Sequence, residues 1–549
     1  MNKKKTIARR EFLENIGKTV GSAAMLRTMT AMGLGLGISG CGSSSAGPAS
    51  GSTGITNPVS VVDNPSSNLK SPRPSDWNSG IGIGKSVVIL GAGIAGMSSA
   101  YELQKLGYTV SILEATNRAG GRNRTIRSGD AVTELNSSQT CIFDNNPELY
   151  FNPGPARIAH HHEFLLGYCR EFGVALENFT NDNRAALLHS TSAFGGEPQV
   201  AKTILSDIRG HISSLLAMAI NQNALDQSLT SNDKVNILNM LKGFGNLNNN
   251  YLYQGGSRAG FLGQENVGSR DRDTQINIKT LQDIVADSFI DSQSRLNYSH
   301  GINQQPAMLQ PKGGMDKIAK AFEQKVLSYI TYEGVVKQIR KLSDGVKIIY
   351  EKNGTSFEVT ADYCICTIPT TVLKDIPNDF SVNHQQEIEQ FEYSSASKLA
   401  FQSRRFWEQD HSIYGGISWT NQAITQMWYP SNALGSNTGI IVGAYIWGTS
   451  AANIFSEQTP QERISSAMQQ GNNIHSEYQS EASRGISIAW KNIPFQLGAY
   501  GRSSAVTLLT PDDNIFFAGE HLSILKGWQE GAILSAYHSI NEIVKKSST

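Results

Sequence analysis

The spacing of hydrophobic and polar residues changes along the chain, and each spacing predicts a different kind of secondary structure. Residues 86–90 (SVVIL) form a continuous apolar run, which is typical of a strand buried on both faces of a parallel sheet. Between residues 391 and 510, apolar and polar residues alternate in SKLAFQS, GIIVGAYIW and SIAWKN, so this region predicts a second sheet. Residues 161–310 show mainly a helical pattern with Asn- and Gly-rich breaks such as GFGNLNNNYLYQGG.

The first apolar run leads directly into a glycine motif. Gly91, Gly93 and Gly96 have the G-x-G-x-x-G spacing, and a second predicted strand, TVSIL, ends at Glu114, 18 residues beyond Gly96. Gly91 permits a tight turn, Gly93 lets the backbone approach a pyrophosphate, and Gly96 allows close packing of helix and strand. The helix N-terminus then faces the phosphates, and the carboxylate accepts hydrogen bonds from a ribose. The pattern predicts a Rossmann-like dinucleotide site.

Three further motifs indicate which dinucleotide binds. RAGGRNRT (residues 118–125) follows the ribose acid, PKGGMDKIAKAF spans 311–322, and DNIFFAGEHLSILKGWQEGAILSAYHSI spans 513–540. Together with GAGIAG they resemble the FAD-dependent flavin amine oxidase superfamily over most of residues 86–549, most weakly in 180–310. The resemblance implies an FAD cofactor with these contacts: Gly91, Gly93, Ala95, Gly96, Glu114, Ala115, Gly121, Arg122, Pro155, Ala156, Arg157, Val336, Glu520 and Trp528.

The resemblance also implies a fold, and together with the composition of the first 85 residues it gives a domain plan. We expect an α/β fold with a Rossmann-like FAD-binding domain of the amine oxidase and glutathione reductase type. The expected parts are a signal at 1–40, a flexible tether at 41–85, a discontinuous FAD domain at 86–160, 311–390 and 511–549, a helical insertion at 161–310, and a mixed-sheet substrate domain at 391–510. A helix from about Gln529 would point its N-terminus at the flavin N1/O2 edge, where it favours negative charge.

Within the superfamily, the chain looks most like bacterial L-amino acid oxidases. GPARI (154–158) resembles the segment whose arginine, here Arg157, holds the substrate carboxylate in a bidentate pair. GIIVGAYIWG resembles the strand whose tyrosine, here Tyr445, donates to the same carboxylate. Trp447 lies two residues further along that strand and would line the side-chain pocket. Gly527 would lie against the flavin face.

Three residues are expected at the reacting centre. The lysine in SSASKLAFQS, Lys398, corresponds to a family lysine that holds a water near flavin N5 and is linked to oxygen reactivity. Trp528 and Tyr500, the latter on a facing strand, would sandwich the substrate amine and exclude water. An aromatic residue at Tyr500 departs from the animal L-amino acid oxidase pattern, which has an aliphatic residue there. A full aromatic cage is more typical of oxidases of simple amines and also fits a bulky amino acid.

The implied reaction is hydride transfer from the α-carbon of an L-amino acid, large or aromatic, to flavin N5. Dioxygen then reoxidises the flavin to give H₂O₂, and water converts the imino acid into a 2-oxo acid and ammonia. Two alternatives stay open. One is an amine oxidase or dehydrogenase acting on an amine without a carboxylate, in which Arg157 is structural. The other is an amino acid 2-monooxygenase, which decarboxylates its substrate to an amide.

Composition adds information about the protein's location. The 47 basic and 47 acidic residues of the whole chain balance. Positions 1–40 contain seven basic and two acidic residues, so the rest of the chain has a net charge of −5. This charge does not indicate binding to nucleic acid. Arg9 and Arg10 precede a weakly apolar run that ends at Cys41, which resembles a twin-arginine lipoprotein signal. The alternative is an ordinary signal peptide cleaved elsewhere. We expect a periplasmic or cell-envelope homodimer whose only membrane contact is a lipid anchor at Cys41.

The remaining cysteines and a run of histidines give weaker signals. Cys364 and Cys366 alternate in an apolar strand and are expected to pack in the core, while a disulfide between Cys141 and Cys169 stays open. Three adjacent histidines, His160–His162, follow GPARI. Neighbouring helical positions point about 100° apart, so these rings cannot all bind one metal, and no metal site is predicted. His162 is expected to pack near the cofactor or the insertion.

Overall fold

The structure is a computed structural model that describes residues 71–261, 276–286, 298–447 and 449–548. From Arg73 onward these residues belong to one compact unit. The predicted export signal and the lipidation site at Cys41 lie outside the described residues. Among the residues that are described, no helix has the length and apolar character needed to cross a bilayer.

The prediction of a flexible tether up to residue 85 is wrong for its last part. A short 3-10 helix, η2 (Pro74–Asp76), leads into Trp77, which is buried. The Trp77 ring meets the ring of Tyr537 edge-on, with 5.6 Å between centroids. Arg73 pairs with Glu163 at 2.6 Å. One buried tryptophan can fix a polar segment to the core, and a count of polar residues does not reveal such an anchor.

A five-stranded parallel sheet underlies the dinucleotide motif. Its order is β19-β13-β1-β2-β9, and every neighbouring pair is parallel. The strands are β1 (Ser86–Leu90), β2 (Thr109–Glu114), β9 (Ile330–Tyr332), β13 (Tyr363–Cys366) and β19 (Ile515–Phe517). They come from three distant segments of the chain, so the sheet unites residues that the sequence keeps far apart.

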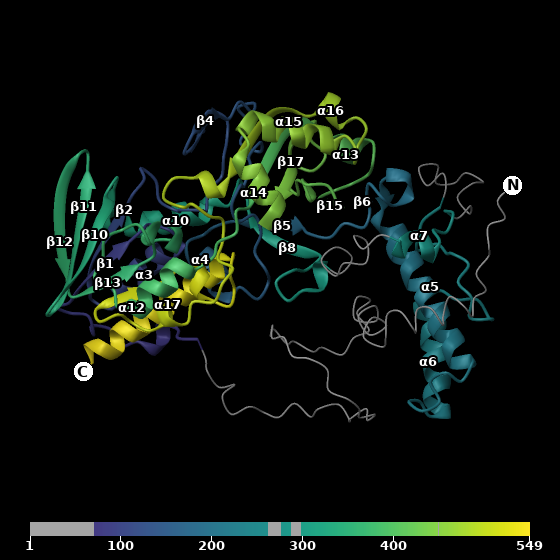
Figure 1. Cartoon of the computed structure of the whole chain (residues 1–549), viewed down its shortest axis with the longest axis horizontal. Helices are drawn as coiled ribbons and strands as arrows, with labels where there is room; N and C mark the ends of the chain where they lie inside the picture. Colours follow the sequence, from purple (N-terminus) through teal and green to yellow (C-terminus); the bar gives the residue numbers. More distant parts are fainter. Residues whose placement is uncertain (1–70, 262–275, 287–297, 448, 549) are drawn as a thin grey trace. The chain divides into compact units, whose positions relative to one another are not determined.

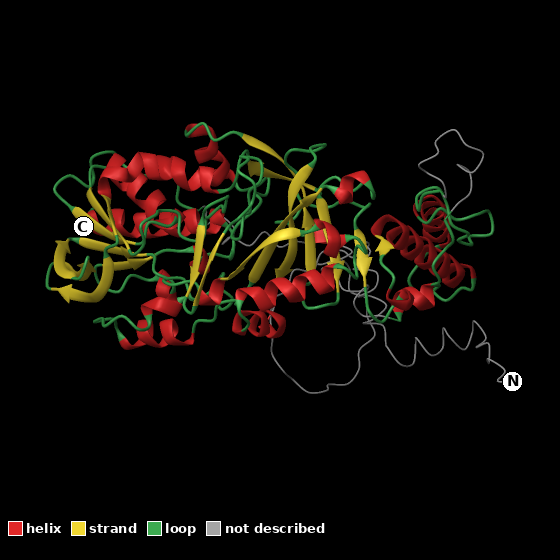
Figure 2. Cartoon of the chain, turned by 90° about the horizontal axis from the view of Figure 1, so that it is seen from above, coloured by secondary structure: helices red, strands yellow, loops and turns green. Residues whose placement is uncertain are grey.

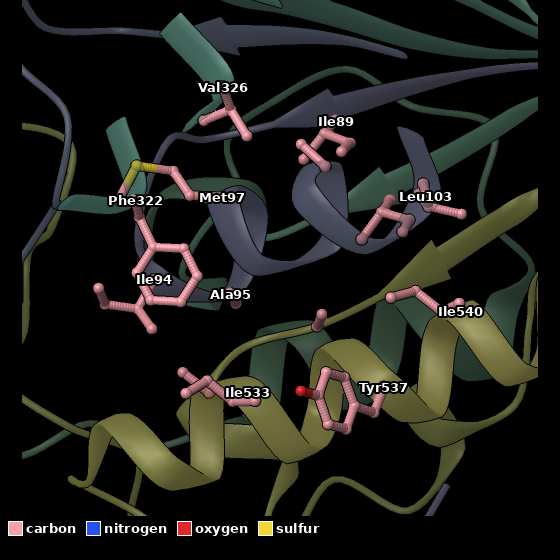
Figure 3. Packing of buried hydrophobic residues seen from close by; sticks show 14 of the residues in the cluster. Ile89, Ile94, Ala95, Met97, Leu103, Phe322, Val326, Ile533, Tyr537 and Ile540 are labelled. Atoms are coloured by element: carbon pink, nitrogen blue, oxygen red, sulfur yellow. The ribbon is translucent and has the colours of Figure 1, made fainter. Parts of the chain in front are cut away.

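Alternate residues of β1 contribute to two different cores. Val87 and Ile89 pack with helices on one face, whereas Val88 and Leu90 face the other. Figure 3 shows Ile89 of β1 together with helix residues such as Met97, Phe322 and Ile533 in the first core. The helices of this face are α3 (Ile94–Lys105), α4 (Glu163–Glu171), α10 (Asp316–Val326) and α17 (Gln529–Ser547). Burial on both faces explains why the first strand is a continuous apolar run.

A three-stranded antiparallel sheet contributes to the second core. Its order is β10-β11-β12, with β10 (Val335–Leu342), β11 (Gly345–Lys352) and β12 (Thr355–Ala361). Val336, Ile339 and Ile348 of this sheet belong to the same cluster as Val88 and Leu90. Two helices follow β13 in the chain, α11 (Thr370–Leu373) and α12 (Val382–Gln390).

A seven-stranded mixed sheet forms the second large layer. Its order is β18-β14-β17-β16-β15-β6-β7. The strands are β6 (Leu187–His189), β7 (Gln199–Val200), β14 (Ser397–Arg404), β15 (Gly416–Thr420), β16 (Gln426–Tyr429), β17 (Thr438–Ile446) and β18 (Ser483–Ala489). The associated helices are α13 (Phe406–Gln409), α14 (Thr449–Glu457), α15 (Pro460–Gly471) and α16 (Tyr478–Glu481). The alternating pattern of residues 391–510 therefore predicts the main part of this sheet.

The segment 161–310 is less helical than its pattern suggests. Helices α5 (Ala201–Asn221), α6 (Ser231–Phe244) and α7 (Leu281–Val285) form a group at the right of Figures 1 and 2. The same segment also supplies β6 and β7 to the mixed sheet, and β5 (Leu176–Thr180) pairs with β8 (Ala307–Pro311). These strands have two to five residues, too few for a period-2 pattern to be recognised. A separate hairpin joins β3 (Ala131–Glu134) to β4 (Ser137–Thr140).

The four described cysteines are buried free thiols. Cys141 and Cys169 belong to different hydrophobic clusters, so the open question of a disulfide is answered against one. Burial raises the pKa of the Cys141 thiol to about 11. Cys364 and Cys366 lie on β13 and pack in the core, as predicted. The thiols therefore act as small apolar side chains.

Candidate active site

A cavity of about 500 Å³ is lined by segments from the parallel sheet, the three-stranded sheet and the seven-stranded sheet. Its walls include the turn between β1 and α3, the end of β2, the start of β10, the 153–157 segment, β14, β17 and the start of α17. Of the predicted site residues, Gly96 alone does not line the cavity. The predicted residues that do line it are Gly91, Gly93, Ala95, Glu114, Ala115, Gly121, Arg122, Pro155, Ala156, Arg157, Val336, Lys398, Tyr445, Trp447, Tyr500, Glu520, Gly527 and Trp528. The fold thus gathers distant motifs around one space.

Gly96 lies outside the lining and fits the packing role predicted for the third glycine. A Cβ atom there would lie 2.0 Å from the carbonyl oxygen of Gly91, so any side chain would separate α3 from β1. Gly91 has a φ of +105°, which favours glycine. A Cβ at Gly93 would meet nothing within 4 Å, because this residue borders the open cavity. The turn therefore has the shape of a phosphate cradle.

Glu114 holds the glycine turn in place. Its Oε2 accepts a hydrogen bond from the Ala92 amide at 2.8 Å, and its Oε1 accepts from the Thr116 amide at 2.9 Å and hydroxyl at 2.7 Å. The carboxylate lines the cavity at the carboxyl end of β2. A ribose bound beside a glycine turn of this kind would lie next to this carboxylate.

A buried ion pair connects the second glycine loop to the C-terminal motif. Arg122 donates to Glu520 at 2.7 Å, and Glu520 also accepts from the amides of Gly527 at 2.7 Å and Gly501 at 3.2 Å. Burial alone would raise the pKa of Glu520, but Arg122 and these contacts hold it below its usual value. Glu520 is therefore an anion that fixes the loop carrying Gly527 and Trp528.

The N-terminus of α17 opens onto the cavity. Trp528 is its N-cap residue and Gln529 its first helical residue. Asn123 donates to Gln529 Oε1 at 2.6 Å, while Asn123 Oδ1 and Gln529 Nε2 are buried without a hydrogen-bond partner. Buried polar atoms of this kind normally have partners. A flavin ring supplies donors and acceptors on one edge, so the residues present fit an FAD cofactor.

Arg157 lies in a cage of aromatic rings. Its guanidinium carbon is 4.5 Å from the ring centre of Trp428, 5.4 Å from that of Tyr298 and 5.8 Å from that of Phe179. One nitrogen donates to the Tyr298 hydroxyl, but Nε and Nη1 are buried without a hydrogen-bond partner. A desolvated guanidinium with unpaired N–H groups is costly unless an anion binds it. The cage therefore has the properties of a carboxylate site.

Lys398 and Tyr445 face each other across neighbouring strands. They are register partners in β14 and β17, and the Lys398 Nζ is 4.6 Å from the Tyr445 ring centre. The Nζ donates to the carbonyl oxygens of Gly154 at 2.8 Å and Asn152 at 3.3 Å. Burial, reinforced by the charge of Arg157, holds the pKa of Lys398 well below its usual value. This lysine points into the protein rather than into solvent, and its polar surroundings are two backbone carbonyls.

Tyr500 lines the cavity from a loop, so its predicted placement on a facing strand is wrong. Tyr500 lies at a bend, and its segment makes one isolated bridge, between Gly501 and Tyr393, while the Tyr500 carbonyl accepts from the Ser394 amide at 2.9 Å. Gly527 has a φ of +79°, and a Cβ there would lie 3.5 Å from the Tyr500 ring. The Tyr500 ring therefore packs over the loop that carries Trp528.

The histidine run does not form a helix face, because α4 begins only at Glu163. Neighbouring rings of His160, His161 and His162 instead meet edge-on at 5.4 and 4.8 Å. His162 packs edge-on against Trp528 at 5.0 Å, near the cavity, as expected. Burial lowers the pKa of His162 to about 4, so its ring is neutral at pH 7.

Several lining residues were not predicted from the sequence. Tyr298, Trp428, Gln426, Trp490 and Thr367 all border the cavity. Trp428 lies on β16, whose register with β17 pairs it with Val442. The run QMWY is short and does not alternate, and only the fold brings the Trp428 ring to 4.5 Å from the guanidinium carbon of Arg157. Tyr298 had no usable signal because it lies in the segment where resemblance is weakest.

The comparisons with known proteins agree with this geometry. The model of the flavin containing amine oxidoreductase family matches residues 94–543. The chain belongs to this family. It is an FAD-dependent oxidoreductase that acts on CH–NH₂ groups, uses a small-molecule substrate and has an α/β fold built around the cofactor.

Relatives at low identity are named as amino acid oxidases. The chain is 27% identical to YobN of Bacillus subtilis (strain 168), provisionally assigned as an L-amino-acid oxidase, over 84% of this chain and 94% of that protein. It is 24% identical to an L-amino-acid oxidase of Siganus canaliculatus, over 84% and 85%. The flavin-dependent L-tryptophan oxidase RebO of Lentzea aerocolonigenes also shares 24% identity, over 84% and 98%.

Solved structures with the same fold include oxidases of other amines. Putrescine oxidase bound to putrescine has a TM-score of 0.56 at 16% identity, over 84% of this chain and 99% of that one. Cyclohexylamine oxidase of Brevibacterium oxydans IH-35A has a TM-score of 0.54 at 15% identity, over 85% and 100%. At these identities the similarity shows the fold alone, and the substrate has to be argued from the site.

Proposed function

We propose that this protein oxidises an L-amino acid to a 2-oxo acid, ammonia and H₂O₂, consuming one dioxygen and one water per turnover. When bound, FAD would supply the acceptor for a hydride from the substrate α-carbon and the route by which the electrons reach dioxygen. The protein residues supply binding, orientation and the exclusion of water. The relatives named as L-amino-acid oxidases support this assignment.

The observation that carries the proposal is the unpaired guanidinium of Arg157. Its Nε and Nη1 are buried without a partner, and its aromatic neighbours cannot accept in-plane hydrogen bonds from both. A carboxylate satisfies two such donors in a bidentate pair. A diamine or a cyclic amine offers no anion, so it would leave the charge of Arg157 unpaired. Tyr445, which lines the same cavity, would donate a further hydrogen bond to the carboxylate.

Other side chains orient the reacting amine. Trp528 and Tyr500 border the cavity beside the loop that Glu520 fixes, so they would enclose the substrate nitrogen. Apolar walls favour the neutral amine, which is the form that releases a hydride. Lys398 would hold a water close to the reacting centre through its Nζ. No side-chain base is required for this sequence of events.

We further propose that the preferred side chain is large or aromatic. Trp447, Trp428 and Tyr298 line the cavity together. Trp447 Nε1 is buried without a hydrogen-bond partner, so a substrate with a polar group on a bulky side chain would gain an additional contact. The relative named as a flavin-dependent L-tryptophan oxidase also supports a preference for a large aromatic side chain.

A substrate panel with product analysis tests the proposed reaction. Each of the twenty L-amino acids, together with putrescine and 2-phenylethylamine, is supplied to the FAD-loaded protein, and H₂O₂, ammonia and 2-oxo acid are measured. We expect equal amounts of the three products from bulky L-amino acids. Efficient oxidation of the amines alone would overturn the amino acid assignment, and an amide with CO₂ would identify a decarboxylating monooxygenase instead.

A further inference from the structure

A second cluster of potential ligands lies outside the cavity. His411 follows α13, and His475 and Glu477 lie between α15 and α16. None of the three lines the active-site cavity. One side-chain atom from each residue can be chosen so that all three lie within 4.8 Å of one another. Two distant segments of the chain therefore bring two imidazoles and a carboxylate together.

His475 is the buried member of the cluster. Its side chain has no exposed area, whereas the side chains of His411 and Glu477 are 35% and 24% exposed. The Nε2 atom of His411 contacts Glu477 Oε1, and the Nδ1 atom of His475 lies 4.0 Å from the same oxygen. The cluster is thus closed on the protein side and open to solvent on the other.

The hydrogen bonds around His475 leave one ring nitrogen unpaired. Its Nε2 is 2.6 Å from the Tyr429 hydroxyl, which is itself 2.6 Å from the Ser418 hydroxyl. Its Nδ1 is buried without a hydrogen-bond partner and faces Glu477. If Nε2 carries the proton and donates to Tyr429, a bare lone pair faces a carboxylate, and a bound cation would relieve that repulsion.

We propose that His411, His475 and Glu477 bind one divalent transition-metal ion of the zinc class. Two imidazole nitrogens and one carboxylate oxygen are ligands that zinc accepts, with a water in the fourth position. Hard cations such as Mg²⁺ and Ca²⁺ prefer an all-oxygen set. The hydrogen bond between His475 Nε2 and the Tyr429 hydroxyl corresponds to the outer contact that usually orients a metal-binding imidazole.

The cluster needs only small side-chain movements to close on a metal, since His411 Nε2 already contacts Glu477 Oε1 and His475 Nδ1 lies 4.0 Å from that oxygen. Zinc–nitrogen bonds of about 2.0–2.1 Å place tetrahedral ligands roughly 3.3 Å apart. His411 and Glu477 can supply the movement because both reach solvent, while His475 stays fixed beside Phe406 and Tyr429. The bound ion would link the turn after α13 to the segment before α16, and it would thereby stabilise the packing of these two segments against each other.

Zinc titration of the FAD-loaded protein tests this proposal. The protein is first dialysed against a chelator, and Zn²⁺ is then added in competition with a chromophoric chelator. We expect one equivalent of zinc to bind the unchanged protein and to raise its Tm. In H411A and E477Q we expect zinc affinity to fall by about tenfold or more and the rise in Tm to disappear.

A matched variant controls for adventitious binding to surface histidines. His300 is exposed and lies outside the cluster, so H300A should bind zinc as the unchanged protein does. The proposal is overturned if no stoichiometric zinc binds, or if H411A and E477Q retain the affinity of the unchanged protein. The oxidase reaction is measured in parallel, because the metal site is expected to leave it unaltered.

Discussion

At the residue scale, the site depends on charged groups placed where solvent cannot reach them. A lysine on a strand is usually exposed, yet Lys398 is 4% exposed and donates to two backbone carbonyls. Arg157 lies among aromatic rings, and its Nε and Nη1 atoms are buried without a hydrogen-bond partner. Both groups carry a desolvation cost that bound ligands can offset. Such residues identify the site more sharply than the glycine motif does.

Replacing Lys398 with methionine tests its role towards oxygen. The variant keeps the aliphatic stem beside Tyr445 but removes the amine, so substrate binding should persist. We expect reoxidation by dioxygen to slow roughly 100-fold while anaerobic reduction by substrate changes little. Stopped-flow absorbance separates the two half-reactions. K337M, on the exposed side of β10, is the control, and equal slowing of both half-reactions in K398M would contradict the assignment.

At the element scale, the cofactor region is built from glycine-rich turns and from helices that begin at the cavity. The βα turn, the loop fixed by Glu520 and the N-terminus of α17 all converge on the cavity. Each is a local feature of the sequence, which is why motifs predict them well. Their mutual packing depends on close approach between backbones.

Two glycine substitutions should separate cofactor binding from folding. G93A adds a methyl group into open space, so the apo-protein should lose no more than about 1 kcal/mol while FAD binding falls sharply. G96A places a methyl group against the Gly91 carbonyl and should cost about 3 kcal/mol of apo-protein stability. Denaturant unfolding and flavin content give the two readings. An apo-protein destabilised equally by both changes would refute the distinction.

Glu530 connects the N-termini of two helices. It lies in the first turn of α17, and its carboxyl oxygens accept from the amides of Phe164 at 3.1 Å and Leu165 at 2.8 Å in α4. Burial raises its pKa from 4.5 to about 7. Because the folded state binds this proton more tightly than the unfolded state, the protonated Glu530 carboxyl contributes to the free energy of unfolding in full below pH 4.5. That contribution is lost as the pH rises through 7.

The change E530Q should therefore alter how stability depends on pH. Relative to the unchanged protein, the variant should gain stability between pH 4.5 and pH 8, by about 3 kcal/mol at most. Urea unfolding at several pH values measures this difference. E542Q, on the same helix beside Lys545, should show no such trend. A constant difference across the range would show that the Glu530 carboxyl is not perturbed as described.

At the scale of the whole molecule, segments far apart in sequence share one cavity. The sequence predicts three strands of the parallel sheet, at 86–90, at TVSIL and around Cys364 and Cys366, whereas the seven-stranded sheet recruits β6 and β7 from a segment expected to be helical. Arg157 is predicted from its local motif, but its neighbours Tyr298 and Trp428 are not. These two residues are far from Arg157 in sequence, and only the tertiary fold brings their rings to its guanidinium. Short strands and loop residues such as Tyr500 carry too little local pattern to be placed.

The proposed lipid anchor is also a property of the whole chain. If Cys41 is lipidated after twin-arginine export, C41A should move the protein from the membrane fraction to the soluble fraction without changing its specific activity. Replacing Arg9 and Arg10 with lysine should keep the protein inside the cell. Fractionation with immunoblotting measures both effects. Membrane association that persists in C41A would exclude an anchor at this cysteine.

The central claim is that Arg157 selects a substrate carboxylate. The most direct measurement compares kcat/KM for L-phenylalanine and 2-phenylethylamine, which differ only in that group, in the unchanged protein, R157A, R157K and the surface control R340A. We predict that R157A lowers the ratio of the two values roughly 100-fold, that R157K does not restore it, and that R340A leaves it unchanged. A ratio that stays the same in R157A would contradict the account.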